Sequence, residues 1–225
     1  MKRKTLMLAL MLSLGLAAHA QWRVGATVGA DHNHYSIDRQ YLNDYSYRDR
    51  WGVTAGVTGQ YNFFSWLGVR ADLNWTQKNY RVERSLVKMD YKIANNYLQL
   101  PVMACFSFGG TKWRGFCNLG VYGAYWMSSH RDAVDTNTFW TNTYSSDESV
   151  DFYSERDKRW DCGLVGGVGV EYRFAEHWGA QLEVRCYYST TSTVKQVSEH
   201  VKDYRYNTTT ALQCGVNYYF SGKKK

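Results

Sequence analysis

The stretch from 208 to 220, near the C-terminus, alternates between two kinds of residue at every step. One set is apolar and occupies every second position: Leu212, Cys214, Val216, Tyr218 and Phe220. The residues between them are small or polar. Successive side chains of a β-strand point to opposite faces, so this stretch is predicted to be a strand with one apolar face. The unpaired edges of such a strand require partners from the rest of the chain.

Seven further stretches show the same period of two and are predicted strands: 22–30, 51–63, 67–75, 96–108, 111–127, 160–174 and 178–188. Some of the connections are turns of two or three residues: 64–66, 109–110 and 175–177. The others are expected to be long loops: 31–50, 76–95, 128–159 and 189–207. This alternation of short and long connections predicts an all-β fold, an eight-stranded antiparallel up-and-down transmembrane β-barrel.

The N-terminus has the composition of an export signal. A basic start at 2–4 precedes an apolar run, and an Ala-x-Ala cleavage site follows at 18–20. This predicts a secretory signal peptide over residues 1–20. The barrel domain is then expected over 21–220, with a basic C-terminal tail over 221–225.

The charge balance argues against one class of partner. The formal net charge is +7, and it falls to +4 without the three basic residues of the predicted signal. The remaining basic residues are interspersed with acidic ones, so nucleic-acid binding is not expected. No later segment approaches eighteen consecutive apolar residues, so no transmembrane helix is predicted either.

The second face of the predicted strands carries charges of both signs: Arg23, Arg70, Asp72, Glu171, Arg173, Glu183 and Arg185. These residues could line an ion or proton path. However, an eight-stranded barrel has an interior just wide enough for side chains to fill. We therefore predict that the charges pair across the lumen and close it, so that Glu183→Gln destabilises the barrel more than it alters permeability.

Tryptophans mark both ends of the predicted strands. Six have the outward parity: Trp22, Trp113 and Trp178 at the short-turn end, and Trp51, Trp75 and Trp160 at the long-loop end. Trp66 and Trp126 also lie at strand ends, but on the inward parity. Two aromatic belts are typical of a membrane-spanning barrel. They favour lipid outside over a soluble lipocalin-like barrel with its apolar face inward, which the alternation alone would allow.

The face assignment makes a direct prediction for one strand. Leu119 and Val121 should face lipid, so Val121→Arg should cost about 2–4 kcal/mol. Gly120 has the inward parity, and Gly120→Ser is expected to be far milder.

Two motifs carry a resemblance to a known family. They are Tyr-Leu-Gln-Leu-Pro at 97–101 and Gly-Leu-Val-Gly-Gly-Val-Gly-Val-Glu-Tyr at 163–172. Together with the export signal and the eight alternating stretches, they resemble the small outer membrane β-barrel family of Gram-negative bacteria, which includes PorT-like proteins. The resemblance covers most of the chain, and it implies location in the cell outer membrane as a monomer, surrounded by membrane lipid and lipopolysaccharide.

The resemblance also implies an assembly signal. The barrel-assembly machinery of such proteins reads an aromatic residue at the C-terminus. Tyr218 and Phe220 are expected to serve this role here, although residues 221–225 follow them. The machinery would therefore read the signal slightly inside the chain.

The sequence offers little chemistry for catalysis. Neither G-x-S-x-G nor H-E-x-x-H occurs, and His32 and His34 alone do not make a metal site. No cofactor is expected. The predicted function is that of a non-enzymatic outer membrane protein that acts through its long loops, in adhesion, partner binding or envelope integrity. A narrow pore for ions or small solutes and a lipid-modifying enzyme at the barrel rim are the alternatives.

Overall fold

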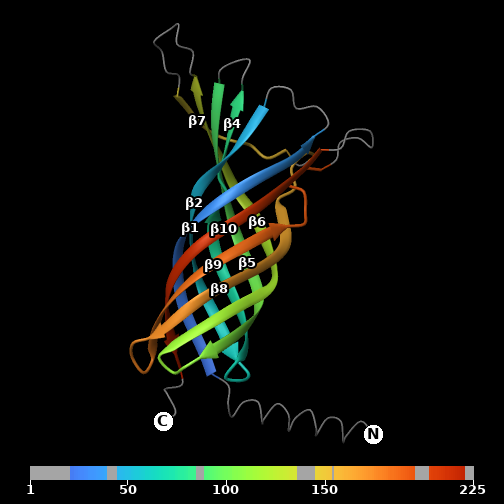
Figure 1. Ribbon diagram of the computed structural model, residues 1–225. Coiled ribbons are helices and arrows are strands. Elements are labelled where there is room, and N and C mark those ends of the chain that lie inside the picture. The colour runs from blue at the N-terminus through green and yellow to red at the C-terminus, as the bar shows by residue number, and fades with distance from the viewer. Residues whose placement is uncertain are drawn as a thin grey trace, which may run out of the picture.

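A computed structural model describes residues 21–39, 45–84, 89–135, 145–153, 155–195 and 203–220 (Figure 1). The predicted signal peptide and the predicted basic tail lie outside these ranges. Within the described ranges, no helix has the length and apolarity that crossing a membrane requires.

The described residues form ten β-strands, and every pairing between them is antiparallel. In chain order the strands are β1 (Gln21–Arg39), β2 (Tyr45–Asn62), β3 (Leu67–Gln77), β4 (Tyr80–Arg84), β5 (Met89–Gly109), β6 (Trp113–Asp135), β7 (Ser145–Ser149), β8 (Trp160–Arg173), β9 (Trp178–Ser189) and β10 (Asp203–Tyr219).

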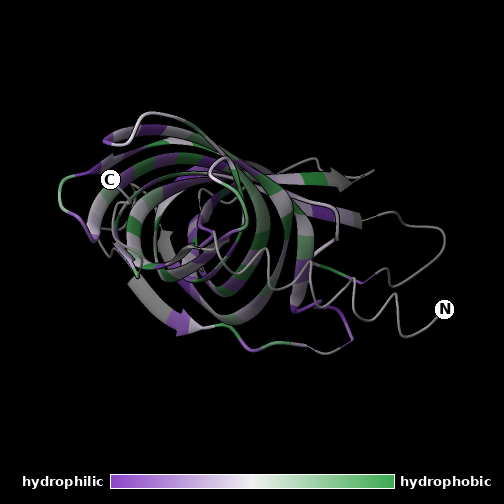
Figure 2. Ribbon diagram, turned by 90° about the horizontal axis from the view of Figure 1, so that it is seen from below, coloured by the Kyte–Doolittle hydropathy of each residue, from purple (hydrophilic) through white to green (hydrophobic). Residues whose placement is uncertain are grey.

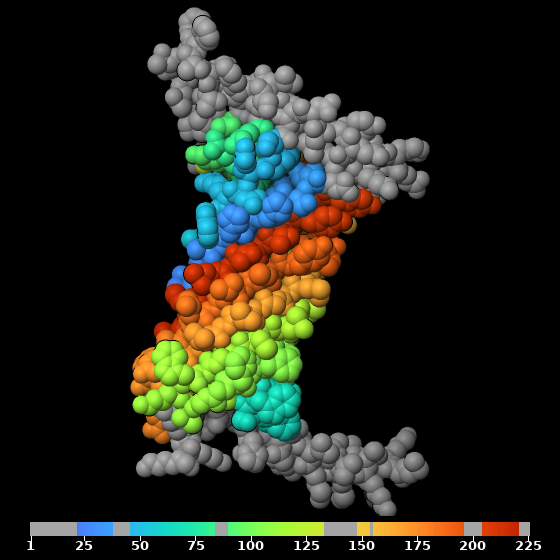
Figure 3. Space-filling view, viewed as in Figure 1, coloured from blue at the N-terminus to red at the C-terminus, as the bar shows by residue number. Residues whose placement is uncertain are grey.

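Eight of the ten strands close into a ring. The order is β1, β2, β3, β5, β6, β8, β9 and β10, and β1 pairs with β10 to complete the circle. Figure 2, which looks along the barrel, shows the strands winding around one lumen, and Figure 3 shows neighbouring strands as diagonal bands across the outer surface. The prediction of an eight-stranded antiparallel barrel is confirmed.

The two ends of the barrel differ. At one end, the turn end, three short connections join β2 to β3, β5 to β6 and β8 to β9, and the described chain begins and ends there (Figure 1). Gly109 has a φ of 110°, and Gly110 N–H donates to the Trp113 carbonyl at 2.9 Å. This is the left-handed conformation that a tight Gly-Gly hairpin requires.

At the opposite end, the hairpin end, the strands run further than the sequence predicts. β1 continues to Arg39 and β2 begins at Tyr45, so most of the predicted loop 31–50 is strand. The predicted loops 76–95, 128–159 and 189–207 likewise contain β4, β7 and the extensions of β5, β6 and β10. The loop boundaries were wrong because both faces of these extensions meet polar surroundings, so the apolar alternation stops before the strand does.

The two faces of the barrel wall have opposite character. Leu119 and Val121 are 67% and 58% exposed on the outside, whereas Arg70, Glu183 and Arg185 are fully buried inside. An apolar outer face and a polar interior match a barrel in lipid, and they rule out the lipocalin-like arrangement. Val121 therefore faces outward as predicted.

Two predictions about individual residues are wrong. Trp66 is 53% exposed instead of facing inward, because it lies in the turn before β3 and not in the alternating strand. Gly120→Ser is not expected to be mild, because a Cβ at this position would overlap the backbone carbonyl of Val102. The close approach of the neighbouring strand therefore requires glycine there.

Candidate functional site

Four charged residues meet in the middle of the lumen. Arg70 and Asp72 come from β3, and Glu183 and Arg185 come from β9, across the barrel. Arg70 Nε donates to Asp72 Oδ1 at 2.8 Å, and Arg70 Nη1 donates to Glu183 Oε2 at 3.1 Å. Arg185 Nη1 and Nη2 donate to Asp72 Oδ2 and Glu183 Oε2, both at 2.7 Å. Asn118 Nδ2 adds a bond of 2.8 Å to Glu183 Oε1.

This central quartet, Arg70, Asp72, Glu183 and Arg185, is electrically balanced and dry. It holds two positive and two negative charges, and all four side chains have 0% exposure. An unpaired charge at this depth would be strongly destabilising, whereas a closed network satisfies each one. The quartet therefore occupies the lumen cross-section instead of lining a water-filled path.

The other predicted lumen charges lie nearer the turn end. Arg23 forms a buried ion pair with Glu171 and also donates to Gln60. Arg173 is only half-buried, and its guanidinium carbon lies 3.9 Å from the ring centroid of Tyr219. Arg173 thus stacks on an aromatic ring at the edge of the lumen, apart from the quartet.

A further buried pair was not predicted. Lys78 lies in the predicted loop 76–95, but it is fully buried, and its Nζ donates to Asp161 Oδ2 at 2.5 Å. Asp161 Oδ1 also accepts bonds from Tyr122 Oη at 3.2 Å and from Ser189 Oγ at 2.6 Å. Every second residue from Asp72 onward points inward, and this series continues just past the end of β3 to Lys78. Extending the alternation by one step would therefore have identified Lys78 as an inward residue.

Between this buried pair and the hairpin end, the alternation of inward and outward side chains shifts by one residue in β6. In the pairing of β5 with β6, Tyr97 lies opposite Trp126 but Asn96 lies opposite Ser128, so Met127 is an extra residue in β6. Such a β-bulge shifts the side chains beyond it by one position. As a result Ser129 and Arg131 turn inward in the upper part of β6.

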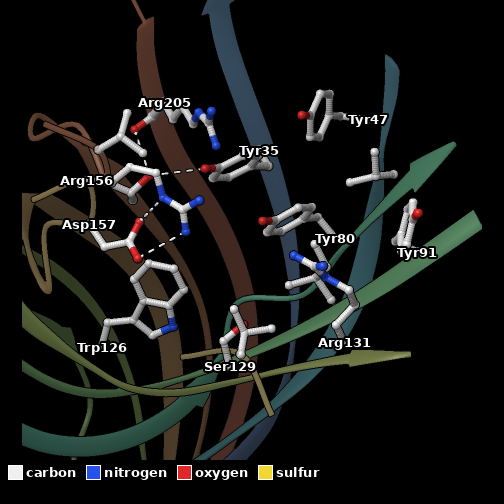
Figure 4. A pocket seen from close by; sticks show the side chains of 15 residues that line it. Tyr35, Tyr47, Tyr80, Tyr91, Trp126, Ser129, Arg131, Arg156, Asp157 and Arg205 are labelled. Atoms are coloured by element: carbon white, nitrogen blue, oxygen red, sulfur yellow. Dashed lines mark hydrogen bonds and ion pairs between the residues drawn. The ribbon is translucent and has the colours of Figure 1, made fainter. Parts of the chain in front are cut away.

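A pocket of about 300 Å³ opens at this level, inside the hairpin end of the barrel (Figure 4). We call it the mouth pocket. Its lining residues are Tyr35, Tyr47, Tyr80, Val82, Tyr91, Ile93, Trp126, Ser129, Arg131, Val150, Arg156, Asp157, Thr193, Val194 and Arg205.

Tyrosines form one wall of the mouth pocket. Tyr35 of β1 and Tyr80 of β4 are stacked, with ring centroids 4.3 Å apart and planes 4° apart, and Tyr47 of β2 packs beside both. The Tyr35 and Thr193 hydroxyl oxygens are hydrogen-bonded at 3.1 Å. Burial raises the pKa of Tyr35 and raises that of Tyr80 still more, so both phenols are neutral at physiological pH.

Three arginines line the mouth pocket from different sides. Arg156 Nε and Nη2 donate to the two carboxylate oxygens of Asp157 at 2.8 and 3.2 Å, and this hydrogen bonding raises the pKa of Arg156. The guanidinium carbon of Arg131 lies 5.7 Å from the ring centroid of Tyr91. Arg205 of β10 lines the pocket beside Tyr35 (Figure 4).

Two segments that lie between strands, 155–158 and 190–195, hold the side of the pocket that contains Arg156. Lys158 N–H donates to the Thr193 carbonyl at 2.9 Å, and Lys195 N–H donates to the Arg156 carbonyl at 2.7 Å. Thr193 N–H in turn donates to the Arg205 carbonyl of β10 at 2.9 Å. Because β7 and β10 do not pair with each other in the described sheet, these backbone bonds replace strand pairing at this level. They hold Arg156 and Asp157 in position.

The floor of the mouth pocket is aromatic. Trp126 stacks on the buried Tyr97 with centroids 5.8 Å and planes 9° apart. Below it, Lys78 Nζ lies 4.8 Å from the centroid of the Tyr97 ring. The pocket is thereby separated from the charged lumen. Its residues were missed from the sequence because most lie in segments that were predicted to be loops.

The remaining predicted site residues lie on the outside of the barrel. The six belt tryptophans all have outward side chains, from 38% exposure at Trp75 to 66% at Trp51. Phe220 is 60% exposed, and its N–H donates to the Trp22 carbonyl at 3.1 Å. Tyr218 packs against Trp178. The assembly role of Tyr218 and Phe220 stays a prediction.

The two histidines that were considered as metal ligands, His32 and His34, lie near the outer surface. His34 Nδ1 lies 2.8 Å from Asp49 Oδ1 at the surface, and His32 packs edge-on against Trp51. Among the residues that the structure describes, no three His, Cys, Asp or Glu side chains gather closely enough to hold a metal ion.

Comparison with known proteins decides the family. Residues 17–195 match the family described as the outer membrane protein beta-barrel domain. The chain belongs to this family. The resemblance seen in the sequence is therefore confirmed, and the protein resides in the cell outer membrane.

Three solved barrels illustrate the range of similar structures. Ail of Yersinia pestis, solved in complex with the heparin analogue sucrose octasulfate, is 14% identical over 89% of this chain and 99% of its own, with a TM-score of 0.42. Outer Membrane Protein W of E. coli is 14% identical over 90% and 98%, with a TM-score of 0.48. A major outer membrane protein from Thermus thermophilus is 12% identical over 89% and 99%, with a TM-score of 0.49. No curated protein sequence matches the chain.

Proposed function

We propose that this protein is a non-enzymatic outer membrane barrel that binds an extracellular ligand at its hairpin end. The observation that carries the proposal is the contrast along the barrel axis. The quartet fills the lumen with paired charges, while the mouth pocket above it is open. A barrel built in this way can present a binding site without conducting.

The placement of the mouth pocket supports the proposal. It lies at the end opposite to the short turns, which in outer membrane barrels face the periplasm. The strand extensions hold it beyond the tryptophans Trp51 and Trp160. A rigid β-scaffold positions the pocket residues more firmly than long loops would. Outer membrane lipid, lipopolysaccharide and the barrel-assembly machinery are the other partners that we propose for this monomer.

The two alternatives have less support. A pore would require a path past the central quartet, where no side chain is exposed. A rim enzyme would require an activated nucleophile. The described lining of the mouth pocket includes the Ser129 and Thr193 hydroxyls but no histidine to activate them.

Two measurements test the proposal. Planar-bilayer recordings of the reconstituted protein should show no steady channels. Wild type and Ser129→Trp, which places a bulky ring in the mouth pocket, should then be compared on an array of extracellular glycans and matrix proteins. We expect binders that Ser129→Trp loses while it retains the heat-modified gel shift of a folded barrel. Steady conductance in the wild type, or binding that Ser129→Trp leaves unchanged, would overturn the proposal.

A further inference from the structure

We infer that the mouth pocket binds an acidic saccharide, a sugar ring that carries a carboxylate or sulfate group. The inference rests on the proposed function and names the ligand class of the same site. The charge, surface chemistry and size of the pocket support this ligand class.

The charge of the lining selects an anion. Arg131, Arg156 and Arg205 contribute three positive charges and Asp157 one negative charge, which leaves a net charge of +2. The rest of the described lining is uncharged. Guanidinium groups bind carboxylate and sulfate oxygens through paired N–H donors, and the surrounding aromatic rings reduce competition from water.

The uncharged lining suits a ring with hydroxyl groups. Tyr35, Tyr47, Tyr80 and Tyr91 each offer a flat apolar ring and a neutral hydroxyl at its edge. A sugar ring has the complementary pattern, with C–H groups on its faces and hydroxyls around its edge. Ser129 and Thr193 add further hydroxyl groups to the lining, and that of Thr193 is hydrogen-bonded to Tyr35.

On one side of the pocket, the backbone pairing disfavours an extended peptide. Peptides that bind to β-proteins commonly use the free N–H and C=O groups of a strand edge. Here β4 is paired on both sides, with β2 and β5, and the upper part of β6 is paired with β5 and β7. Tyr80, Tyr91 and Arg131 therefore project from strands without a free edge, and recognition on this side depends on side chains. Tyr35 and Tyr47 lie on stretches of β1 and β2 that each pair on one side.

The size of the pocket sets the length of the ligand. A volume of about 300 Å³ is at the lower end of the range for small-molecule sites, and it fits one or two sugar rings. The opening of the pocket lets a longer saccharide chain continue into solvent. A terminal or internal acidic sugar of a polysaccharide thus fits the site.

The test uses the full-length barrel in detergent micelles and three small probes at equal ionic strength. D-glucuronate carries both the ring hydroxyls and the charge, D-glucose lacks the charge, and cyclohexanecarboxylate lacks the hydroxyls. Saturation-transfer NMR and calorimetry report binding. We expect D-glucuronate to bind at least about 10-fold more tightly than either of the other two. N-acetylglucosamine 6-sulfate should likewise exceed N-acetylglucosamine.

Two variants with the same charge change connect the binding to the pocket. Arg131→Gln removes a lining arginine and should weaken D-glucuronate binding about 10-fold. Arg48→Gln removes an exposed arginine of the same end, which pairs with Glu83 at 3.2 Å outside the lining. It should change the affinity less than 2-fold.

Each other outcome overturns the inference. Equal binding of D-glucose would remove the role of charge, equal binding of cyclohexanecarboxylate would remove the sugar, and an equal effect of Arg48→Gln would indicate general surface attraction. If none of the acidic sugars bind but the array yields another ligand that Ser129→Trp loses, the saccharide inference fails while the proposed function stands.

Competition identifies the source of the sugar. Lipopolysaccharide from the same membrane and soluble hyaluronan, a glucuronate polymer, should be added in turn to the D-glucuronate complex. Displacement by hyaluronan alone indicates a ligand from outside the cell. Displacement by lipopolysaccharide alone indicates an acidic sugar of the surrounding membrane.

Discussion

The central lumen and the mouth pocket are lined by the same barrel wall, but they differ in charge balance: the lumen quartet is neutral, and the pocket is positively charged. In the lumen, Arg70 and Arg185 are matched by two carboxylates, and all four side chains have 0% exposure. In the mouth pocket three arginines face one aspartate, and Arg131 is solvent-exposed. Water stabilises an excess of charge at the mouth but cannot reach the quartet. A charge-selective binding site can therefore form only at the end of the barrel, while the middle has to be neutral.

The largest expected effect tests the neutrality of the lumen. Glu183→Gln leaves Arg70 and Arg185 with Asp72 as the one remaining carboxylate of the quartet, and it should cost about 3–5 kcal/mol of unfolding free energy. Asp157→Asn at the mouth should cost less, about 1 kcal/mol, because Arg156 is 53% exposed and the amide oxygen of Asn can still accept from the Tyr153 N–H. Urea unfolding in lipid vesicles, followed by tryptophan fluorescence, measures both. Equal losses would show that the lumen is not drier than the mouth.

The second prediction compares the outer faces of the same two regions. Val121→Arg places a charge on the apolar band and should cost about 2–4 kcal/mol. Ser36→Arg, on the exposed outer face of the β1 extension, should change the stability by less than about 0.5 kcal/mol. The same unfolding assay applies. A large cost at Ser36 would place the membrane boundary higher than the tryptophans indicate.

The third prediction concerns the junction between the two regions. Lys78→Met removes the bond of 2.5 Å to Asp161 and should cost about 1.5–3 kcal/mol. The effect should be smaller than that of Glu183→Gln, because Tyr122 and Ser189 still donate to Asp161. Ligand affinity at the mouth should change less than 2-fold. A loss above 10-fold would show that the aromatic floor does not isolate the pocket.

The smallest expected effect is that of pH on binding at the mouth. The arginines stay charged, and burial keeps the pKa of Tyr35 and Tyr80 above the usual value of about 10. Deprotonation of a tyrosine would repel an anion, but it would do so only as the pH rises through that raised pKa. The affinity for D-glucuronate should therefore be constant from pH 6 to 9. A fall between pH 8 and 9 would mean that a pocket tyrosine titrates earlier than its burial implies.

The sequence was sufficient to predict the membrane-embedded part of the fold. There each strand meets lipid on one side and a crowded polar lumen on the other, so the alternation directly records the two environments. Arg70, Asp72, Glu183 and Arg185 were identified as inward residues from their parity alone. Their positions near mid-height on two strands also predicted that these four charges pair across the lumen. The individual bonds could not be predicted, because they depend on the register of strands that lie across the barrel.

The hairpin end could not be predicted in the same way. Tyr35, Tyr80 and Arg131 lie on strands whose two faces are both polar, and such strands have no apolar alternation. The inward parity of β1 does continue through Asp31 and Asn33 to Tyr35, so part of the pocket was within reach. The β-bulge in β6 could not be predicted, because a single extra residue does not change the amino-acid composition of the strand in a recognisable way.

That extra residue, Met127, acts as a reading-frame shift between two halves of one strand. On the membrane side of Met127, lipid and the quartet determine which side chains of β6 point outward and which point inward. On the other side, the inward and outward sets of side chains depend on the bulge. If Met127 stayed in the chain but joined the regular pairing instead of bulging, His130 and Asp132 would turn inward and Arg131 would point outside. Deleting Met127 would instead close the bulge and leave Ser129 and Arg131 inward. A barrel of this kind can therefore change the charge at its mouth by gaining or losing one bulge, while every residue in the membrane stays the same.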